Sequence, residues 1–266
     1  MALLMKSYIN GLIIVLQFFS VLPIKREVSM TSKHLERAVR MFSVFGLMTG
    51  AVYASVAYGL MQYTPLSLLA VAFVLWFVTI IATGGIHLDG WMDTSDAFFS
   101  YRDKKKRLSI LKDPQIGAFG VLSVIVLLSA KFLFIYETLE AHTPLTFILI
   151  GLIPFYSRIG MGMMLILVSS AKSSGLGVMF QKAGNQSTLW SYLPILILVL
   201  LGMFIYAWPA GMLASGMLAV TLLLFYMYKK KVIDWFGGMN GDIIGAFVEG
   251  VEVFLWMVLW LLHFYA

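Results

Sequence analysis

Three aspartates stand close together in a glycine-marked segment, residues 83–97. They are Asp89, Asp93 and Asp96. On an α-helix, which turns about 100° per residue, Asp93 lies about 40° from Asp89, and Asp96 about 20° to the other side. Like charges on one stripe repel each other, so a purely structural role would be destabilising. Oxygen ligands in a chain without cysteine favour Mg²⁺, which usually keeps waters and completes its coordination with substrate phosphates.

The same segment contains residues that suit a phosphate site. Gly84 and Gly85 precede the aspartates and would allow a phosphate to approach the backbone closely. His87 is an unusual ligand for Mg²⁺. It either ligates the ion or hydrogen-bonds a carboxylate or a phosphate, and a direct role in catalysis is a further alternative. The alternative interpretation of the whole segment is a solvated acidic face at a membrane surface.

A second acidic cluster lies near the end of the chain. Asp242 follows a run of glycines, and Glu249 and Glu252 occur further along the same apolar segment. On a helix, Glu249 falls about 20° from Asp242, and Glu252 lies about 60° further round. Charged groups within a membrane span are costly and usually face a functional cavity, although glutamates near the interface also reach the headgroups. We expect the cluster to support a second metal ion or an acceptor hydroxyl.

Cationic side chains complement these acids. Arg158 lies in the middle of an apolar segment, where it must either pair with a carboxylate or bind a phosphate. Lys112 precedes another apolar segment and either contacts a phosphate or anchors the chain at the membrane surface. The sequence offers no role for Lys131. Two acidic clusters, together with an arginine within an apolar segment, predict a site for a diphosphate whose charge is neutralised by metal.

The elements that carry these residues must be membrane helices. The chain has 266 residues, of which 61% are hydrophobic and 12% are charged. Soluble domains contain roughly 25% charged residues, so the composition excludes a soluble globule, and it is too apolar for a disordered chain. The net charge of +6 therefore indicates contact with the membrane surface, and we expect no nucleic-acid partner. A single catalytic domain is predicted to cover residues 1–266.

Seven segments are apolar and long enough, at about 20 residues, to cross a bilayer as helices. They are residues 41–61, 66–83, 119–136, 145–168, 190–208, 210–228 and 244–264. Residues 8–21 are shorter and include Asn10 and Gln17, so this segment either spans with a tilt or is re-entrant. We predict an all-α, polytopic integral membrane protein with seven or eight transmembrane or re-entrant helices.

Basic residues gather in loops that alternate along the chain. Most of the 19 lysines and arginines lie in residues 22–40 and 101–117, with further ones at Lys172, Lys182 and 229–231. An alternating path through the spans puts all these loops on one side. By the positive-inside rule that side is the cytoplasm, so we predict that the acidic site lies at the cytoplasmic face.

Several motifs resemble those of the cobalamin synthase family, the adenosylcobinamide-GDP ribazoletransferases. The family signature is similar to Gly84-Gly85-Ile86-His87-Leu88-Asp89-Gly90-Trp91-Met92-Asp93-Thr94-Ser95-Asp96. Further matches, in the order of the family, are residues 107–113 with Ile116-Gly117, Ser157-Arg158, Gly175-Leu176-Gly177, Gly237-Gly238 and Gly241-Asp242. The resemblance covers essentially the whole chain. Asn240 departs from it, because threonine is expected there; both residues can hydrogen-bond a phosphate or cap a helix.

The resemblance implies a Mg²⁺-dependent, multi-pass transferase of the bacterial inner membrane. α-Ribazole or its 5′-phosphate would attack adenosylcobinamide-GDP, so that GMP leaves and adenosylcobalamin or its 5′-phosphate forms. The catalytic and metal-binding residues would be Asp89, Asp93, Asp96 and Asp242, with His87 in catalysis and Glu249 and Glu252 at the metal. Substrate-binding residues would be Gly84, Gly85, Arg107, Lys112, Arg158 and Asn240.

Two other classes of protein are open alternatives. One is another membrane transferase that acts on diphosphates, of the prenyltransferase or CDP-alcohol phosphotransferase type. The aspartate motifs of the former are spaced differently, and Asp93 and Thr94 replace the Ala-Arg pair expected in the latter. The other class is a transporter, which would bring charged groups to the middle of the membrane from two related halves. No internal repeat is found, and the sequence leaves an oligomeric state open.

Overall fold

The computed structural model describes residues 2–100, 103–113 and 115–262, and this part of the chain folds as α-helices. They are α1 (Ala2–Phe19), α2 (Ser32–Arg40), α3 (Phe42–Tyr63), α4 (Leu68–Ile81), α5 (Ile86–Phe99), α6 (Lys104–Ile110), α7 (Ala118–Glu140), α8 (Pro144–Leu167), α9 (Leu176–Ala183), α10 (Gln186–Leu189), α11 (Tyr192–Tyr206), α12 (Trp208–Phe236) and α13 (Gly241–Leu262). The predicted all-α class is confirmed.

Six helical segments among the described residues are long and apolar enough to cross a membrane. They are α3, α7, α8, α12, α13 and the segment Gln186–Tyr206, which joins α10 to α11. They coincide with six of the predicted spans, which confirms a polytopic membrane protein. Residues 263 and 264 of the last predicted span lie outside the described residues.

The predicted span at residues 66–83 requires a correction. α4 has 14 residues, and the chain then bends by 81° into α5, so the two helices make a seventh span only as a broken one. The bend occurs at Gly84 and Gly85, whose φ angles of 64° and 74° lie in the left-handed region that favours glycine. The glycines therefore turn α5 away from α4, and α5 lies outside the six spanning helices.

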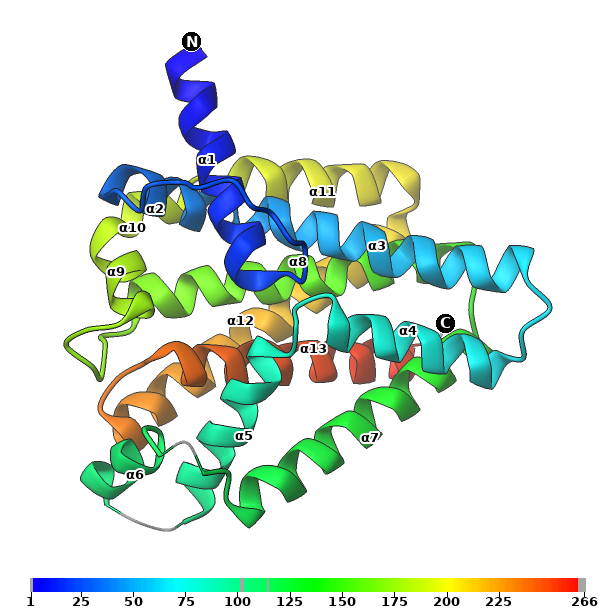
Figure 1. Cartoon of the computed structure of the whole chain (residues 1–266). Helices are drawn as coiled ribbons and strands as arrows, with labels where there is room; N and C mark the ends of the chain where they lie inside the picture. Colours follow the sequence, from blue (N-terminus) through cyan, green and yellow to red (C-terminus); the bar gives the residue numbers. More distant parts are fainter. Residues whose placement is uncertain (1, 101–102, 114, 263–266) are drawn as a thin grey trace.

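α1 crosses the other helices instead of running beside them (Figure 1). Its apolar part, Met5–Phe19, is shorter than a full span. Gln17 holds the returning chain, because its side-chain amide donates to the carbonyl oxygens of Ile24 (3.0 Å) and Arg26 (2.7 Å). α1 therefore does not span alongside the bundle, which argues against the tilted span, one of the two alternatives given for residues 8–21.

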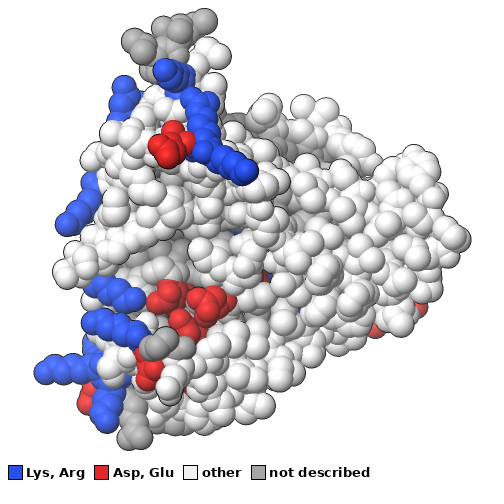
Figure 2. Space-filling model, viewed as in Figure 1, with Lys and Arg blue, Asp and Glu red and all other residues white. Residues whose placement is uncertain are grey.

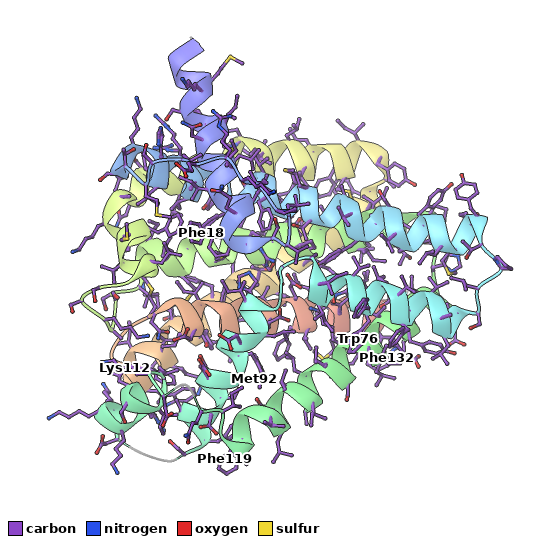
Figure 3. The ribbon with its side chains drawn as sticks, viewed as in Figure 1. Phe18, Trp76, Met92, Lys112, Phe119 and Phe132 are labelled. Atoms are coloured by element: carbon purple, nitrogen blue, oxygen red, sulfur yellow. The ribbon has the colours of Figure 1, made fainter. Side chains whose placement is uncertain are left out.

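The centre of the bundle is α8, which packs against α3, α12 and α13 (Figure 1). α3 approaches it closely through small residues, since a Cβ atom on Gly50 would overlap the carbonyl oxygen of Gly151. Small residues at such crossings allow membrane helices to pack backbone against backbone. On the other side, Trp76 of α4 donates its indole N–H to the carbonyl oxygen of Leu128 on α7 (3.0 Å) and packs edge-on against Phe132 (Figure 3).

Charged side chains are unevenly distributed over the surface. Figure 2 shows the basic side chains along one end of the molecule, while the rest of the visible surface is almost free of them. Acidic side chains are exposed in a depression between two groups of basic ones at this same end. This distribution is the one expected from the alternating basic loops.

Candidate active site

The aspartates of the first acidic cluster meet Asp242 of the second because α5 and α13 cross at close range. A Cβ atom on Gly90 of α5 would stand 2.5 Å from the carbonyl oxygen of Asp242. At the next contact, a Cβ atom on Gly245 of α13 would stand 3.2 Å from the Cα atom of His87. Glycine at both positions therefore lets the backbones touch, and the aspartates of α5 come to lie beside the first turn of α13.

The carboxylates of this crossing influence one another. Burial, together with the nearby charges of Asp89, Asp242 and Asp96, raises the pKa of Asp93 to about 6, while Lys172 opposes them. Burial is the larger cause, and the contributions of the three neighbouring carboxylates place their negative charges close to Asp93. The structure thus brings together four of the acids that the sequence singled out.

Asp96 also contacts the start of α7. Its Oδ1 atom accepts a long hydrogen bond of 3.4 Å from the backbone N–H of Gly120, and Gly117 lies directly against its carboxylate. The N-terminus of a helix attracts negative charge because its first N–H groups have no partner within the helix. Asp96 therefore links α5 to α7 in addition to adding charge to the cluster.

Lys172 is a site residue that sequence reasoning treated only as a basic loop residue. Its Nζ atom lies 3.5 Å from Oδ2 of Asp242. The loop is held there by two backbone hydrogen bonds of 2.8 Å, from Ala171 to the carbonyl oxygen of Met239 and from Met239 to that of Ser169. The available signal was its position just before the glycine motif at residues 175–177.

Lys172 shares a small cavity with Lys112. The cavity has a volume of about 210 Å³, and Ser173 and Ser174 also line it. A neighbouring cavity of about 200 Å³ extends from Lys172 to Asp242. Two ammonium groups and two hydroxyls form a suitable environment for phosphate oxygens, so the structure places Lys112 where its predicted phosphate contact could occur (Figure 3).

Asn240 caps α13. Its Oδ1 atom accepts from the backbone N–H of Ile243 (2.8 Å), and its Nδ2 atom donates to Oδ2 of Asp242 (2.7 Å). Of the two roles that the sequence left open for Asn240, capping is therefore observed. The same side chain fixes the orientation of the Asp242 carboxylate.

Glu249 and Glu252 are predicted to bind metal, but in the structure they contact buried cations. Nζ of Lys131 lies 3.2 Å from a carboxylate oxygen of each, and Arg158 lies 3.0 Å from the other oxygen of Glu252. All four side chains are buried. Buried charges require partners, and here two cations balance two carboxylates. The expectation that these glutamates bind metal is at odds with these ion pairs, which also explain Lys131 and give Arg158 a carboxylate partner.

The remaining predicted substrate-binding residues have structural contacts of their own. The guanidinium group of Arg107 lies over the rings of Phe98 (5.5 Å) and Phe236 (6.0 Å) and so ties α6 to α5 and α12. Gly84 and Gly85 form the turn into α5. Their predicted contacts with phosphate stay predictions.

His87 lies at the start of α5 with 3% of its surface exposed. Its ring stacks on Phe19 of α1, with the ring centroids 5.9 Å apart. Burial lowers the pKa of His87 well below its ordinary value, and the charges of Arg158 and Lys131 lower it further. The imidazole is therefore neutral near pH 7.

The carboxylates do not form a ready-made metal cage. In the part of the chain that the structure describes, no three acidic or histidine side chains are arranged as a metal-binding group. What the site offers is a set of oxygen donors beside a cavity lined with lysines. Such an arrangement can hold an anionic, phosphorylated substrate and the cation that accompanies it.

Comparison with known proteins agrees with this chemistry. A family model described as cobalamin-5-phosphate synthase matches residues 11–260. A curated relative from Geobacillus sp. (strain WCH70), named adenosylcobinamide-GDP ribazoletransferase, is 37% identical over 98% of this chain and 99% of the relative. Relatives with the same name are 38% identical in Geobacillus thermodenitrificans (97% and 98% covered) and 32% identical in Halalkalibacterium halodurans (96% and 97% covered). No solved structure matches.

The family match covers nearly all of the chain, and the relatives align with it from end to end. The signature segment recognised in the sequence forms α5, whose aspartates lie at the site. This chain belongs to the cobalamin-5-phosphate synthase family.

Proposed function

We propose that this protein is an adenosylcobinamide-GDP ribazoletransferase, which performs the final assembly of the nucleotide loop in cobalamin biosynthesis. It joins α-ribazole or its 5′-phosphate to adenosylcobinamide-GDP and releases GMP, giving adenosylcobalamin or its 5′-phosphate. The relatives carry the name of this activity. The observation that carries the proposal is the crossing of α5 and α13, which brings four carboxylates together beside Lys172, a residue that lines a cavity with Lys112.

The reaction is a displacement at phosphorus. A ribose hydroxyl of the acceptor forms a bond to the phosphorus attached to cobinamide and loses its proton. The bond from that phosphorus to the bridging oxygen breaks, and GMP leaves with this oxygen. No covalent enzyme intermediate is needed, so the task of the protein is to position two substrates and to balance charge.

Mg²⁺ is part of the proposal. Asp89, Asp93 and Asp242 offer only oxygen donors, and the raised pKa of Asp93 is consistent with crowded negative charge that a cation would offset. Mg²⁺ usually takes one or two protein carboxylates and fills its remaining positions with waters and substrate phosphates, so a closed protein cage is unnecessary. When bound, it would neutralise the charge on the diphosphate.

Lys172 and Lys112 are the proposed contacts to the diphosphate. The ion pair of Lys172 with Asp242 is long, at 3.5 Å, and its two side chains are 30% and 28% exposed. An exposed pair of this length contributes little to stability, so Lys172 can exchange its carboxylate partner for a phosphate oxygen at small cost. Asn240 holds the Asp242 carboxylate in place meanwhile.

The proposed location is the bacterial inner membrane, with the site facing the cytoplasm. The basic side chains beside the site support this orientation through the positive-inside rule. Adenosylcobinamide-GDP carries a charged diphosphate, which suits a site at the water-facing end of the bundle.

The test is release of GMP by the detergent-purified protein given adenosylcobinamide-GDP and α-ribazole, with and without Mg²⁺. We expect release only with Mg²⁺, and none from Asp89→Ala or Asp93→Ala. Glu140→Ala, at the exposed end of α7, serves as the control and should keep full activity. Full activity in both aspartate variants would overturn the assignment.

The same assay separates the alternative classes of protein. Because detergent abolishes gradients, release of GMP also excludes a transporter. Turnover of prenyl diphosphates or CDP-alcohols instead would favour the alternative transferases.

A further inference from the structure

A cavity of about 140 Å³ adjoins the carboxylates and extends into the bundle. Asp89 and Asp242 line it together with three phenylalanines and His87, and most of its wall is apolar. A diphosphate needs charged or polar partners on every side, so this apolar region is unsuited to it. The cavity therefore suits a different part of a substrate.

The aromatic wall is assembled from segments far apart in the sequence. Phe19 of α1, Phe42 of α3 and Phe180 of α9 lie 5.6 to 6.3 Å from one another, measured between ring centroids. Phe18 extends this cluster on the α1 side through its contact with Phe180 (Figure 3). Because α1 crosses the bundle instead of spanning beside it, its end reaches the cavity. The path of α1 across the bundle thus places Phe19 in the wall of the cavity.

His87 provides a polar group within this apolar wall. It is buried, it lines the cavity, and its Nε2 atom has no hydrogen-bond partner among the described residues. Buried polar atoms in proteins are almost always hydrogen-bonded. An unpartnered imidazole nitrogen at a cavity therefore indicates the place of a polar atom of a ligand.

We propose that this cavity binds the benzimidazole base of α-ribazole, and that the imidazole N–H of His87 donates a hydrogen bond to the free ring nitrogen of that base. The identity of the base depends on the proposed function. The acceptor hydroxyl and the base belong to one small nucleoside, so a hydroxyl at Asp89 and Asp242 places the base in an adjoining space. Aromatic rings attract one another in stacked and edge-to-face geometries, which favours a planar base against this wall.

The size and polarity of the cavity distinguish this base from guanine. An apolar cavity of about 150 Å³ can hold a benzene ring, and this one is not enclosed, so it can accommodate a bicyclic base. Benzimidazole has one free acceptor nitrogen and is otherwise apolar. Guanine carries several donors and acceptors along its edge. With Asp89 and Asp242 assigned to the acceptor hydroxyl, His87 is the one remaining polar side chain among the described residues of the lining, and it would leave most of that edge unsatisfied.

The experiment measures binding without turnover. Equilibrium dialysis of the detergent-purified full chain uses two probes, free 5,6-dimethylbenzimidazole and GMP. We expect His87→Phe, which keeps an aromatic ring but removes the N–H, to weaken binding of the base about tenfold, as loss of a well-formed hydrogen bond would. Binding of GMP should be unchanged. Phe180→Leu, which keeps an apolar side chain, is the second variant, and Phe77→Ala on the exposed face of α4 is the control.

Turnover then supplies a second readout. We expect His87→Phe to raise the KM for α-ribazole and to leave the KM for adenosylcobinamide-GDP unchanged. Unaltered base binding in both His87→Phe and Phe180→Leu, or a loss confined to GMP binding, would overturn the inference. The proposed function would still stand if the unaltered protein released GMP. Conversely, base binding that depends on His87 in a protein that releases no GMP would support this site and refute the proposed function.

Discussion

The backbone of Asp242 occupies the space that a side chain at position 90 would need. A Cβ atom on Gly90 would lie 2.5 Å from the Asp242 carbonyl oxygen, a distance that real Cβ atoms essentially never show. The neighbouring atom is backbone, so it cannot move aside as a flexible side chain would. This contact, with the one between Gly245 and His87, sets the distance between α5 and α13 and hence the spacing of the acids that each helix carries.

Replacing Gly90 by alanine should therefore abolish GMP release. The added methyl group pushes α5 away from α13 and separates Asp89 and Asp93 from Asp242. Gly216→Ala is the matched control, because a Cβ atom on this helical glycine meets nothing within 4 Å. The measurement is GMP release at equal amounts of purified protein. Equal activity in the two variants would show that the close crossing is not needed.

The buried ion pairs should make Lys131 important for stability. Lys131→Met leaves Glu249 without its cation and Glu252 with only Arg158. Breaking a buried pair by removing one partner costs about 3–5 kcal/mol, because a charge is left uncompensated. We expect a clear fall in the Tm of the protein in detergent.

The double variant Lys131→Met/Glu249→Gln tests the cause of that fall. It removes one charge of each sign and leaves Arg158 paired with Glu252. Most of the lost Tm should therefore return. A double variant no more stable than Lys131→Met would mean that packing, and not charge balance, explains the effect.

The cap of α13 predicts different results for two substitutions at one position. Asn240→Ala removes the bond to the Ile243 N–H and the bond to Asp242, and loss of such a cap costs about 1 kcal/mol. We expect a lower Tm and lower activity. Asn240→Thr keeps an oxygen that can cap the helix, so it should retain more of both. The Tm and the GMP release of the two variants are compared. Identical values for both variants would contradict a capping role.

The sequence predicted the apolar spans and the stripe of acids on α5, because both are local patterns. It did not predict that Lys131 pairs with Glu249, which is 118 residues away along the chain. Such a pair depends on which faces of α7 and α13 meet, and hydropathy is nearly uniform around membrane helices. A charge within a span was therefore recognisable as unusual, but its partner was not.

The path of α1 and the role of Lys172 were missed for related reasons. The composition of a short apolar helix is compatible both with a tilted span and with a helix that crosses the bundle. Only the contacts of the helix distinguish the two arrangements. Lys172 is one of many loop lysines in the sequence, and its position beside Asp242 depends on hydrogen bonds between two loops. Both features result from tertiary packing, which no local pattern records.

Lys172 should matter for one substrate and not for the other. Lys172→Gln removes the ammonium group beside Asp242 and leaves the loop hydrogen bonds, which are made by the backbone. Loss of a hydrogen bond from a charged donor costs about 1.5–3 kcal/mol, which corresponds to roughly ten- to hundredfold in affinity. We expect the KM for adenosylcobinamide-GDP to rise by this factor and the KM for α-ribazole to stay the same. Lys182→Gln, an exposed lysine of α9, is the control. An equal rise in both KM values would place Lys172 in the support of the whole site instead of at the diphosphate.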